Sequence, residues 1–280
     1  MPSTFLDDRG LVRVSGSEAR GFLQGLFTCD MEKVAPGAPG FGALLTAQGK
    51  IIVDFFVHQQ GENTFLLDAP QSLLAQLLKL LRLYRLRAVV EIEDVSAAMG
   101  VAAIWDEAPP AGAEPDPRHP GLGARLTGER AALAALPVDR TAYDARRIAC
   151  GVPEGGRDFP YGDTFPHEAN MDLVGGVDFK KGCYVGQEVV SRVQHRGTAR
   201  RRILQVSFDG EALAPGTPIR AGETEVGVLG SSVAGHGLAS IRTDRAHDAS
   251  VAGTPLTLGT LPMTLGALAS GALPSGAQQG

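Results

Sequence analysis

The residues best suited to chemistry lie in one short stretch, Lys181-Gly182-Cys183, directly ahead of a predicted helix. A thiol in this position would feel the positive end of the helix dipole and the ammonium group of Lys181. Both effects favour thiolate over thiol, so the pattern predicts a reactive cysteine at Cys183. The alternative is a tight turn in which Cys183 is a small, half-buried filler.

The residues that follow Cys183 could shape a ligand site. Gly182 and Gly186 would let the backbone approach a ligand closely. Glu188 lies in the first turn of the predicted helix, where it complements the dipole, and both it and Gln187 could fix the loop by hydrogen bonds. Arg192, one turn later, could pair with Glu188 or with an anionic ligand. An ordinary surface helix could carry the same three polar residues.

The string Lys181-Gly182-Cys183-Tyr184-x-Gly186-Gln187-Glu188 resembles the signature of the YgfZ family of folate-binding proteins, which are similar to the T-protein (aminomethyltransferase) of the glycine cleavage system. Other segments resemble the family too, including Phe22-Leu23-Gln24-Gly25 near the start. The resemblance implies an α+β fold with three lobes, two mixed α/β lobes and a small C-terminal β-barrel, around a central hole that binds tetrahydrofolate. It also implies a role in maturing or maintaining iron–sulfur proteins, including enzymes that modify tRNA.

Three polar residues outside this stretch are further candidates. Asp54 interrupts the apolar strand predicted over Ile51–Val57. A carboxylate there must face water or line a cavity, and the sequence alone favours the solvent face. In the T-protein an aspartate of the corresponding strand sits beside the folate, so the resemblance makes Asp54 a candidate folate ligand. Val53 replaces a second aspartate of that strand, which argues against aminomethyl transfer. The resemblance also suggests Glu168 and Asn170, which could equally belong to an ordinary polar loop.

Composition limits the classes of function. The 280 residues carry a net charge of −5 with a pI near 5.7, which argues against general nucleic-acid binding. No apolar run approaches the roughly 20 residues of a membrane span, and the N-terminus has no signal-peptide core, so we expect a soluble cytoplasmic protein. The three scattered cysteines cannot supply the four thiolates of an all-cysteine iron–sulfur site, so cluster chemistry would need a partner. The six histidines show no metal-ligand spacing, and no metal site is assigned.

The pattern of apolar residues predicts the elements that position these groups. Strands are expected at 9–14, 41–46, 51–57, 63–68, 87–95 and 123–127, and helices at 19–27, after Pro70, at 141–150 and after Cys183. The proline-rich segment 107–118 is expected to be a linker. Short strands between Gly and Pro from residue 199 onward predict a small β-barrel. The expected regions are 1–106, an N-terminal α+β region; 120–197, a second α+β region that can interleave with the first; 198–265, the barrel; and 266–280, a flexible tail.

Three functions remain open. The first is a tetrahydrofolate-binding accessory protein for the assembly or repair of iron–sulfur enzymes, acting through Cys183, with folate and iron–sulfur client or assembly proteins as partners. The second is a folate-dependent aminomethyltransferase of the glycine-cleavage type. The third is a folate-binding module with a structural cysteine. The motif favours the first over the second, because the T-protein lacks this thiol in the matching segment.

Overall fold

The computed structural model describes residues 2–197 and 199–266, which belong to two compact units. The first unit contains Met1–Tyr143 and Val174–Gln187, and the second contains Asp144–Leu173 and Glu188–Gly280. The chain leaves the first unit and later returns to it, so the Cys183 loop belongs to the first unit. The region boundaries expected from the sequence remain a prediction. The expected tail lies outside the described residues, apart from Gly266.

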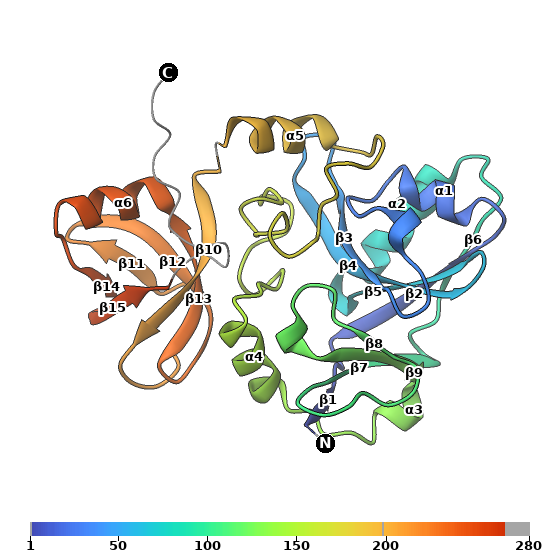
Figure 1. Ribbon diagram of the computed structural model, residues 1–280, viewed down its shortest axis with the longest axis horizontal. Helices are drawn as coiled ribbons and strands as arrows, with labels where there is room; N and C mark the ends of the chain where they lie inside the picture. Colours follow the sequence, from blue (N-terminus) through green and yellow to red (C-terminus); the bar gives the residue numbers. More distant parts are fainter. Residues whose placement is uncertain (1, 198, 267–280) are drawn as a thin grey trace. The chain divides into compact units, whose positions relative to one another are not determined.

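A five-stranded antiparallel sheet of the first unit has the order β3-β4-β5-β2-β6 (Figure 1). Its strands are β2 (Arg9–Ser15), β3 (Gly40–Leu45), β4 (Ile51–Gly61), β5 (Thr64–Pro70) and β6 (Glu91–Asp94). Residues of α1 (Ala19–Gln24) and α2 (Leu74–Arg85) join the core on one face of this sheet. Four leucines of α2, at the spacing of a single helix face, are buried in it: Leu74, Leu77, Leu78 and Leu81. Burying each one contributes roughly 1.5–3 kcal/mol, which fixes the helix on the sheet.

Strand β4 is buried on both faces, but the two faces differ in chemistry. Val53, Phe55 and Val57 belong to the apolar core beneath α1 and α2. Since side chains alternate along a strand, Asp54 and His58 point to the opposite face, and both are buried. Asp54 is only 6% exposed, so the solvent-facing position favoured by the sequence is wrong. The second face therefore has to accommodate charge.

A four-stranded sheet of the first unit has the order β1-β7-β9-β8. Its strands are β1 (Ser3–Phe5), β7 (Met99–Ile104), β8 (Ala113–Pro115) and β9 (Ala124–Glu129), with the short helix α3 (Arg130–Leu133) following. The linker expected at 107–118 is a wrong prediction, because β8 pairs with β9 and both Asp116 and Arg118 are buried. Pro115 is tolerated because β8 is an edge strand, where no ladder hydrogen bond is lost.

The second unit is dominated by the closed β-barrel, which confirms the predicted fold class. The barrel order is β10-β13-β12-β11-β14-β15, with α6 (Thr243–Val251) after β13 (Figure 1). The strands are β10 (Arg201–Phe208), β11 (Pro218–Ala221), β12 (Thr224–Val233), β13 (His236–Arg242), β14 (Leu256–Leu258) and β15 (Leu261–Leu265). Within this unit the fully buried Arg147 donates to Asp158 at 2.5 Å and to Ser231 of β12 at 2.7 Å. These bonds tie the segment after residue 144 to the barrel.

The remaining helices are α4 (Arg140–Ala149), α5 (Gln187–Arg196) and three 3-10 turns, η1 (Met31–Lys33), η2 (Gln71–Leu73) and η3 (Pro120–Leu122). Helix α1 ends three residues earlier than predicted, and Phe27 instead forms a β-bridge to Leu44. Strand β6 begins at Glu91 rather than residue 87, because only its four residues pair with β2. Among the described residues, no helix has the length and apolar character that a membrane crossing requires.

Candidate functional site

The loop that carries the motif is anchored at its start by Asp178. Its carboxylate accepts main-chain N–H bonds from Lys180 at 2.8 Å and Lys181 at 3.1 Å, and it pairs with the ammonium of Lys33. Burial would raise the pKa of Asp178, but the bonds from Lys33 and Lys180 outweigh it and hold the pKa below its usual range. Asp178 therefore stays ionised and fixes the backbone from which the motif begins.

Lys181 is the central residue of the loop. Its Nζ donates to the main-chain carbonyls of Gln24, Phe27 and Cys29 at 2.8, 2.5 and 2.7 Å. An ammonium has three N–H donors, so all three are used on these carbonyls and none is left for Cys183. Burial lowers the pKa of Lys181 below its usual range. The ammonium expected to favour the Cys183 thiolate instead fastens the loop to the last residue of α1 and to the segment that follows it.

Cys183 is exposed, two residues beyond buried Lys181. Helix α5 begins only at Gln187, so Cys183 precedes the helix by four residues and lies outside its first turn. Tyr184 is buried, its ring lies 5.3 Å from Lys181 Nζ, and burial raises its pKa to about 12. An exposed cysteine between two buried side chains is presented outward by the loop. The alternative role for Cys183, a small half-buried side chain that fills a tight turn, is therefore wrong.

The two motif glycines play different parts. Gly186 has a φ of +83°, and a Cβ there would lie 2.5 Å from the carbonyl oxygen of Thr46. Only glycine fits this approach of the loop to the β3–β4 turn. A Cβ at exposed Gly182 would meet nothing within 4 Å, so that position is open to solvent or to a partner. Gln187 accepts the Tyr184 N–H at 3.3 Å, a hydrogen bond within the loop of the kind that the sequence suggested.

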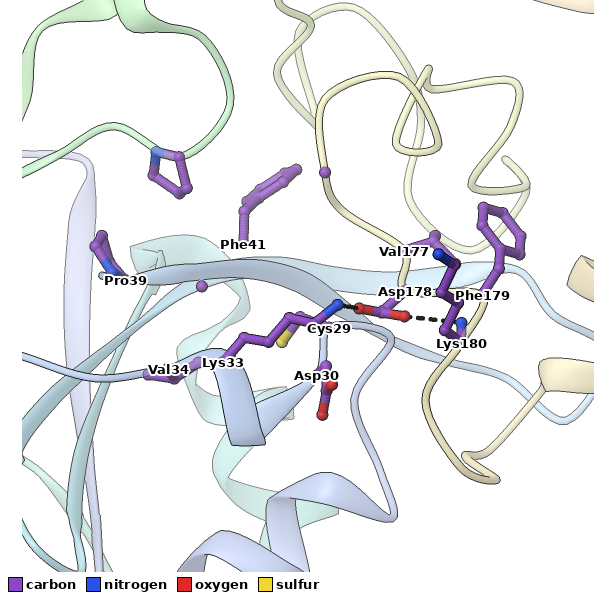
Figure 2. Close-up of a pocket in the computed structure, with 13 residues that line it drawn as sticks. Cys29, Asp30, Lys33, Val34, Pro39, Phe41, Val177, Asp178, Phe179 and Lys180 are labelled. Atoms are coloured by element: carbon purple, nitrogen blue, oxygen red, sulfur yellow. Dashed lines mark hydrogen bonds and ion pairs between the residues drawn. The ribbon is translucent and has the colours of Figure 1, made fainter.

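A cavity of about 480 Å³ opens beside the start of this loop (Figure 2). Figure 2 shows Phe41 and Phe179 on its apolar walls and the linked side chains of Lys33 and Asp178 between them. Its lining residues are Cys29, Asp30, Lys33, Val34, Pro39, Gly40, Phe41, Pro117, Gly175, Val177, Asp178, Phe179 and Lys180. None of the site residues predicted from the sequence lines it. The nearest in sequence is Lys181, next to Lys180.

Cys29 lines this cavity, and its thiol differs from that of Cys183, which does not. It is buried, and burial raises its pKa to about 12 despite the charge of Lys181. Its Sγ would lie 2.8 Å from a Cβ placed at Gly42, so the glycine in β3 makes room for it. Cys29 is therefore a neutral packing thiol at ordinary pH.

A buried ionic network occupies the second face of the five-stranded sheet, and sequence reasoning missed it. Asp68 accepts from Arg9 Nε at 2.6 Å and from Arg125 Nε at 2.9 Å. Burial would raise the pKa of Asp68, but the charges of Arg125 and Arg9 outweigh it and hold the pKa at about 2. The Arg125 guanidinium lies 3.9 Å from the ring centre of Phe56, the residue between Asp54 and His58 on the same face of β4. The face that carries Asp54 is thus rich in fixed positive charge.

The four remaining candidates belong to the second unit. Asn170 donates to the Ile203 carbonyl at 2.7 Å and so binds the edge of β10, while Glu168 accepts the Phe165 N–H at 3.0 Å. Glu188 and Arg192 form an exposed ion pair at 2.6 Å, as the sequence allowed. Such a pair contributes about 0.3–0.5 kcal/mol and leaves both groups accessible. Within the described ranges, no three side chains of the His, Cys, Asp and Glu types come together as metal ligands.

Comparison with known proteins agrees with this architecture. Residues 7–110 match the GCVT N-terminal domain, and residues 200–268 match the CAF17 C-terminal beta-barrel domain. The solved structure of glycine cleavage system aminomethyltransferase T from Bartonella henselae aligns with a TM-score of 0.74 at 16% identity, covering 95% of this chain and 85% of that one. At this identity the likeness concerns the fold alone.

Several curated relatives share one name, iron-sulfur cluster assembly factor IBA57 or its homolog, mitochondrial. The protein from Mycosarcoma maydis is 37% identical, covering 71% of this chain and 55% of that one; the human protein is 35% identical, covering 72% and 65%. The mouse protein is 32% identical, covering 75% of this chain and 67% of its own length. The chain thus spans little more than half of the fungal relative.

These relatives refine two expectations. They are named as mitochondrial proteins, so the expected cytoplasmic location is wrong. The YgfZ family suggested by the motif is a related family, whereas the relatives found are IBA57 proteins. The N-terminal domain match, the barrel match and the mouse relative agree, and the chain belongs to the IBA57 family of GcvT-like proteins.

Proposed function

We propose that this chain acts in iron–sulfur cluster assembly by presenting the Cys183 thiol to a partner protein. The observation that carries the proposal is the contrast between exposed Cys183 and buried Lys181, whose three hydrogen bonds hold the loop rigid. A thiol held in this way can ligate iron at little cost in loop entropy. The relatives named as iron–sulfur cluster assembly factors support the same role.

The partner must supply the other cluster ligands. A cluster bound only by cysteines needs four thiolates. In the described part of the first unit, Cys29 is the other cysteine, and it is buried with a raised pKa. Cys183 would therefore contribute one ligand to a cluster shared between two proteins, with the cluster as cargo rather than a resident cofactor.

The test compares Cys183→Ser with Cys150→Ser. Each purified variant is mixed with a cluster-loaded assembly protein and an apo-enzyme that needs a [4Fe–4S] cluster, and the recovered enzyme activity is followed. We expect Cys183→Ser to slow recovery at least about tenfold, because serine is a poor ligand for iron. Its thermal unfolding should not change, since the side chain is exposed. Equal recovery rates for wild type and Cys183→Ser would contradict the proposal.

We also propose that the cavity beside the loop binds a reduced folate. Its volume of about 480 Å³ lies in the range of small-molecule sites. Phe41 and Phe179 offer apolar faces for a pteridine ring, carboxylates of Asp30 and Asp178 suit its N–H groups, and Lys180 suits the carboxylates of a glutamate tail. When bound, the folate would supply one-carbon or redox chemistry; the residues of this chain would hold and orient it. Clients that modify tRNA remain a further prediction.

Calorimetric titration with tetrahydrofolate tests this assignment and the earlier candidate Asp54 together. Phe179→Ala removes half-exposed cavity wall and is expected to weaken binding about tenfold, by the loss of one stacked aromatic ring. Asp54→Asn is expected to leave affinity within about threefold if the cavity is the site, because Asp54 does not line it. Weaker binding in Asp54→Asn with no change in Phe179→Ala would move the site to the second face of the sheet.

A further inference from the structure

The C-terminal end of α2 and the segment that follows it expose large apolar side chains. Leu83, Leu86 and Val89 are 63%, 85% and 63% exposed. Large apolar side chains are exposed at seven of the described residues. Three of these seven fall within the short segment 83–89. Single exposed apolar residues are ordinary, whereas a local group of them marks a surface that binds something.

Leu86 is also strained. Its φ of +48° lies in the left-handed region, where glycine is the usual residue at a helix end. A leucine there brings its Cβ too close to the backbone, and at 85% exposure it contributes little to the core. Strain of this kind, without a packing benefit inside the chain, points to a use outside it.

The loop that holds these residues is fixed in place. The Val89 N–H donates to Glu18 Oε2 at 2.5 Å. Gly16 packs so closely that a Cβ there would lie 2.3 Å from the Val89 carbonyl oxygen. The apolar group is therefore preorganised, which reduces the entropy lost on binding.

Four basic residues are interspersed in the sequence with the apolar group or lie just before it. Lys79, Arg82, Arg85 and Arg87 are exposed, and none of their side chains forms an ion pair within the described ranges. Lys79, Arg82 and Leu83 are spaced at i, i+3 and i+4, so they share one face of α2. This surface is positively charged, whereas the whole chain carries a net charge of −5. Two carboxylates belong to the same neighbourhood: Glu18 accepts from the Val89 N–H, and exposed Glu91 follows Val89 by two positions in the sequence.

We propose that one surface docks an amphipathic segment of a partner protein in which aliphatic side chains alternate with carboxylates. This surface, called the α2 surface, consists of Lys79, Arg82, Leu83, Arg85, Leu86, Arg87 and Val89. Leu83, Leu86 and Val89 would bury the aliphatic groups, and the guanidinium forks would hold carboxylates in paired hydrogen bonds. Three arginines to one lysine, with two carboxylates among them, fit patterned protein charge better than a uniformly anionic membrane. The proposal does not depend on the role of Cys183.

The test uses two designed helical peptides of about 18 residues, long enough to form a stable apolar face. Both carry the same leucine stripe, flanked by glutamate in one and by lysine in the other. Fluorescence anisotropy with the full chain is expected to show binding of the glutamate peptide alone, weakening as salt is raised. The double variant Arg82→Glu/Arg85→Glu should weaken it at least about tenfold, and Leu86→Gly about fivefold without lowering the Tm.

Arg220→Glu, a single charge reversal at an exposed residue of β11, is the control and should not change binding. No binding of the glutamate peptide to wild type, equal binding of the lysine peptide, or full binding by the α2 variants would each overturn the proposal. A further outcome would also overturn it: the wild type does not bind the glutamate peptide but sediments with phosphatidylserine vesicles, and the α2 variants do not sediment. The surface would then be a membrane site.

Discussion

Replacing Asp68 with asparagine is expected to lower the free energy of unfolding by about 3–5 kcal/mol, because it leaves two buried arginines without their shared carboxylate. Arg9 and Arg125 are 7% and 2% exposed, so neither guanidinium can turn to water without moving the sheet. Their bonds to the two carboxylate oxygens, 2.6 and 2.9 Å long, are strengthened by charge. Urea denaturation followed by circular dichroism measures the change.

The matched control for this substitution is Asp7→Asn. Asp7 is exposed, so the same chemical change there should alter stability by less than about 0.5 kcal/mol. A loss below about 1 kcal/mol for Asp68→Asn would mean that solvent reaches the two arginines and screens them. The fold of the first unit would then rest on its apolar cores rather than on this network.

The same carboxylate gives the stability a defined pH dependence. The pKa of Asp68 is held at about 2 in the folded chain, below its ordinary value of 3.8. A group whose pKa is lowered by folding stabilises the protein above its unfolded pKa, and that contribution disappears as the pH falls through the folded pKa. The stability difference between wild type and Asp68→Asn should therefore shrink by about 2 kcal/mol between pH 5 and pH 2. A difference that stays constant with pH would contradict the assignment of this shift.

The apolar skeleton could be predicted from the sequence, because its signals are local. Alternation over a few residues identified the strands of the five-stranded sheet and the strand-rich region of the barrel, and the leucine spacing after Pro70 identified α2. The two strands predicted at 41–46 and 51–57 correspond to β3 and β4, with the dipeptide Gln48-Gly49 in the turn between them. Each of these predictions needs only neighbours along the chain, which the sequence supplies directly.

The ionic network could not be predicted in the same way. Asp68 and Arg9 are 59 positions apart, and Asp68 and Arg125 are 57 apart. Each of these charges lies near the end of a strand, where a solvent-exposed residue is the ordinary reading. One signal was available: Asp54 and His58 fall on the same face of β4, four positions apart. Two polar residues on one face of an apolar strand indicate that the face carries charge.

The prediction of an exposed linker over the proline-rich segment 107–118 was wrong for a related reason. Four prolines between residues 107 and 118 indicate irregular backbone, which is true of most of it. Irregular backbone need not be exposed, however, and here it brings Asp116 and Arg118 into the protein as a 2.8 Å ion pair. Burial of a charged loop depends on long-range partners, including Tyr143, whose hydroxyl accepts from Arg118 at 2.9 Å. Composition alone carries no information on such partners.

Removing the Lys181 ammonium is expected to have the second large effect on stability. The same substitution separates two roles for Lys181, holding the loop and favouring the Cys183 thiolate. The motif indicated Lys181, but the three carbonyls that it binds lie more than 150 positions away in the chain. Lys181→Met keeps the length of the apolar stem and leaves these carbonyls without their donor. Since an unsatisfied buried polar group costs about 1–3 kcal/mol, we expect unfolding to become easier by about 3 kcal/mol in total. Exposed Lys180→Met is the control, with little change.

The rate at which iodoacetamide alkylates Cys183 decides between the two roles. If Lys181 holds the loop, Lys181→Met lowers stability and the loop becomes mobile, while the alkylation rate at a fixed pH changes by less than about threefold, because the ammonium is engaged elsewhere. If Lys181 instead favours the thiolate, stability is unchanged and alkylation slows about tenfold or more. Desolvation of the ammonium, which lowers the pKa of Lys181, is a cost that the fold sustains only through its bonds to the three carbonyls. For this reason we expect the first outcome. Lys181 then holds the loop that positions the Cys183 thiol, and it does not stabilise the negative charge of the thiolate.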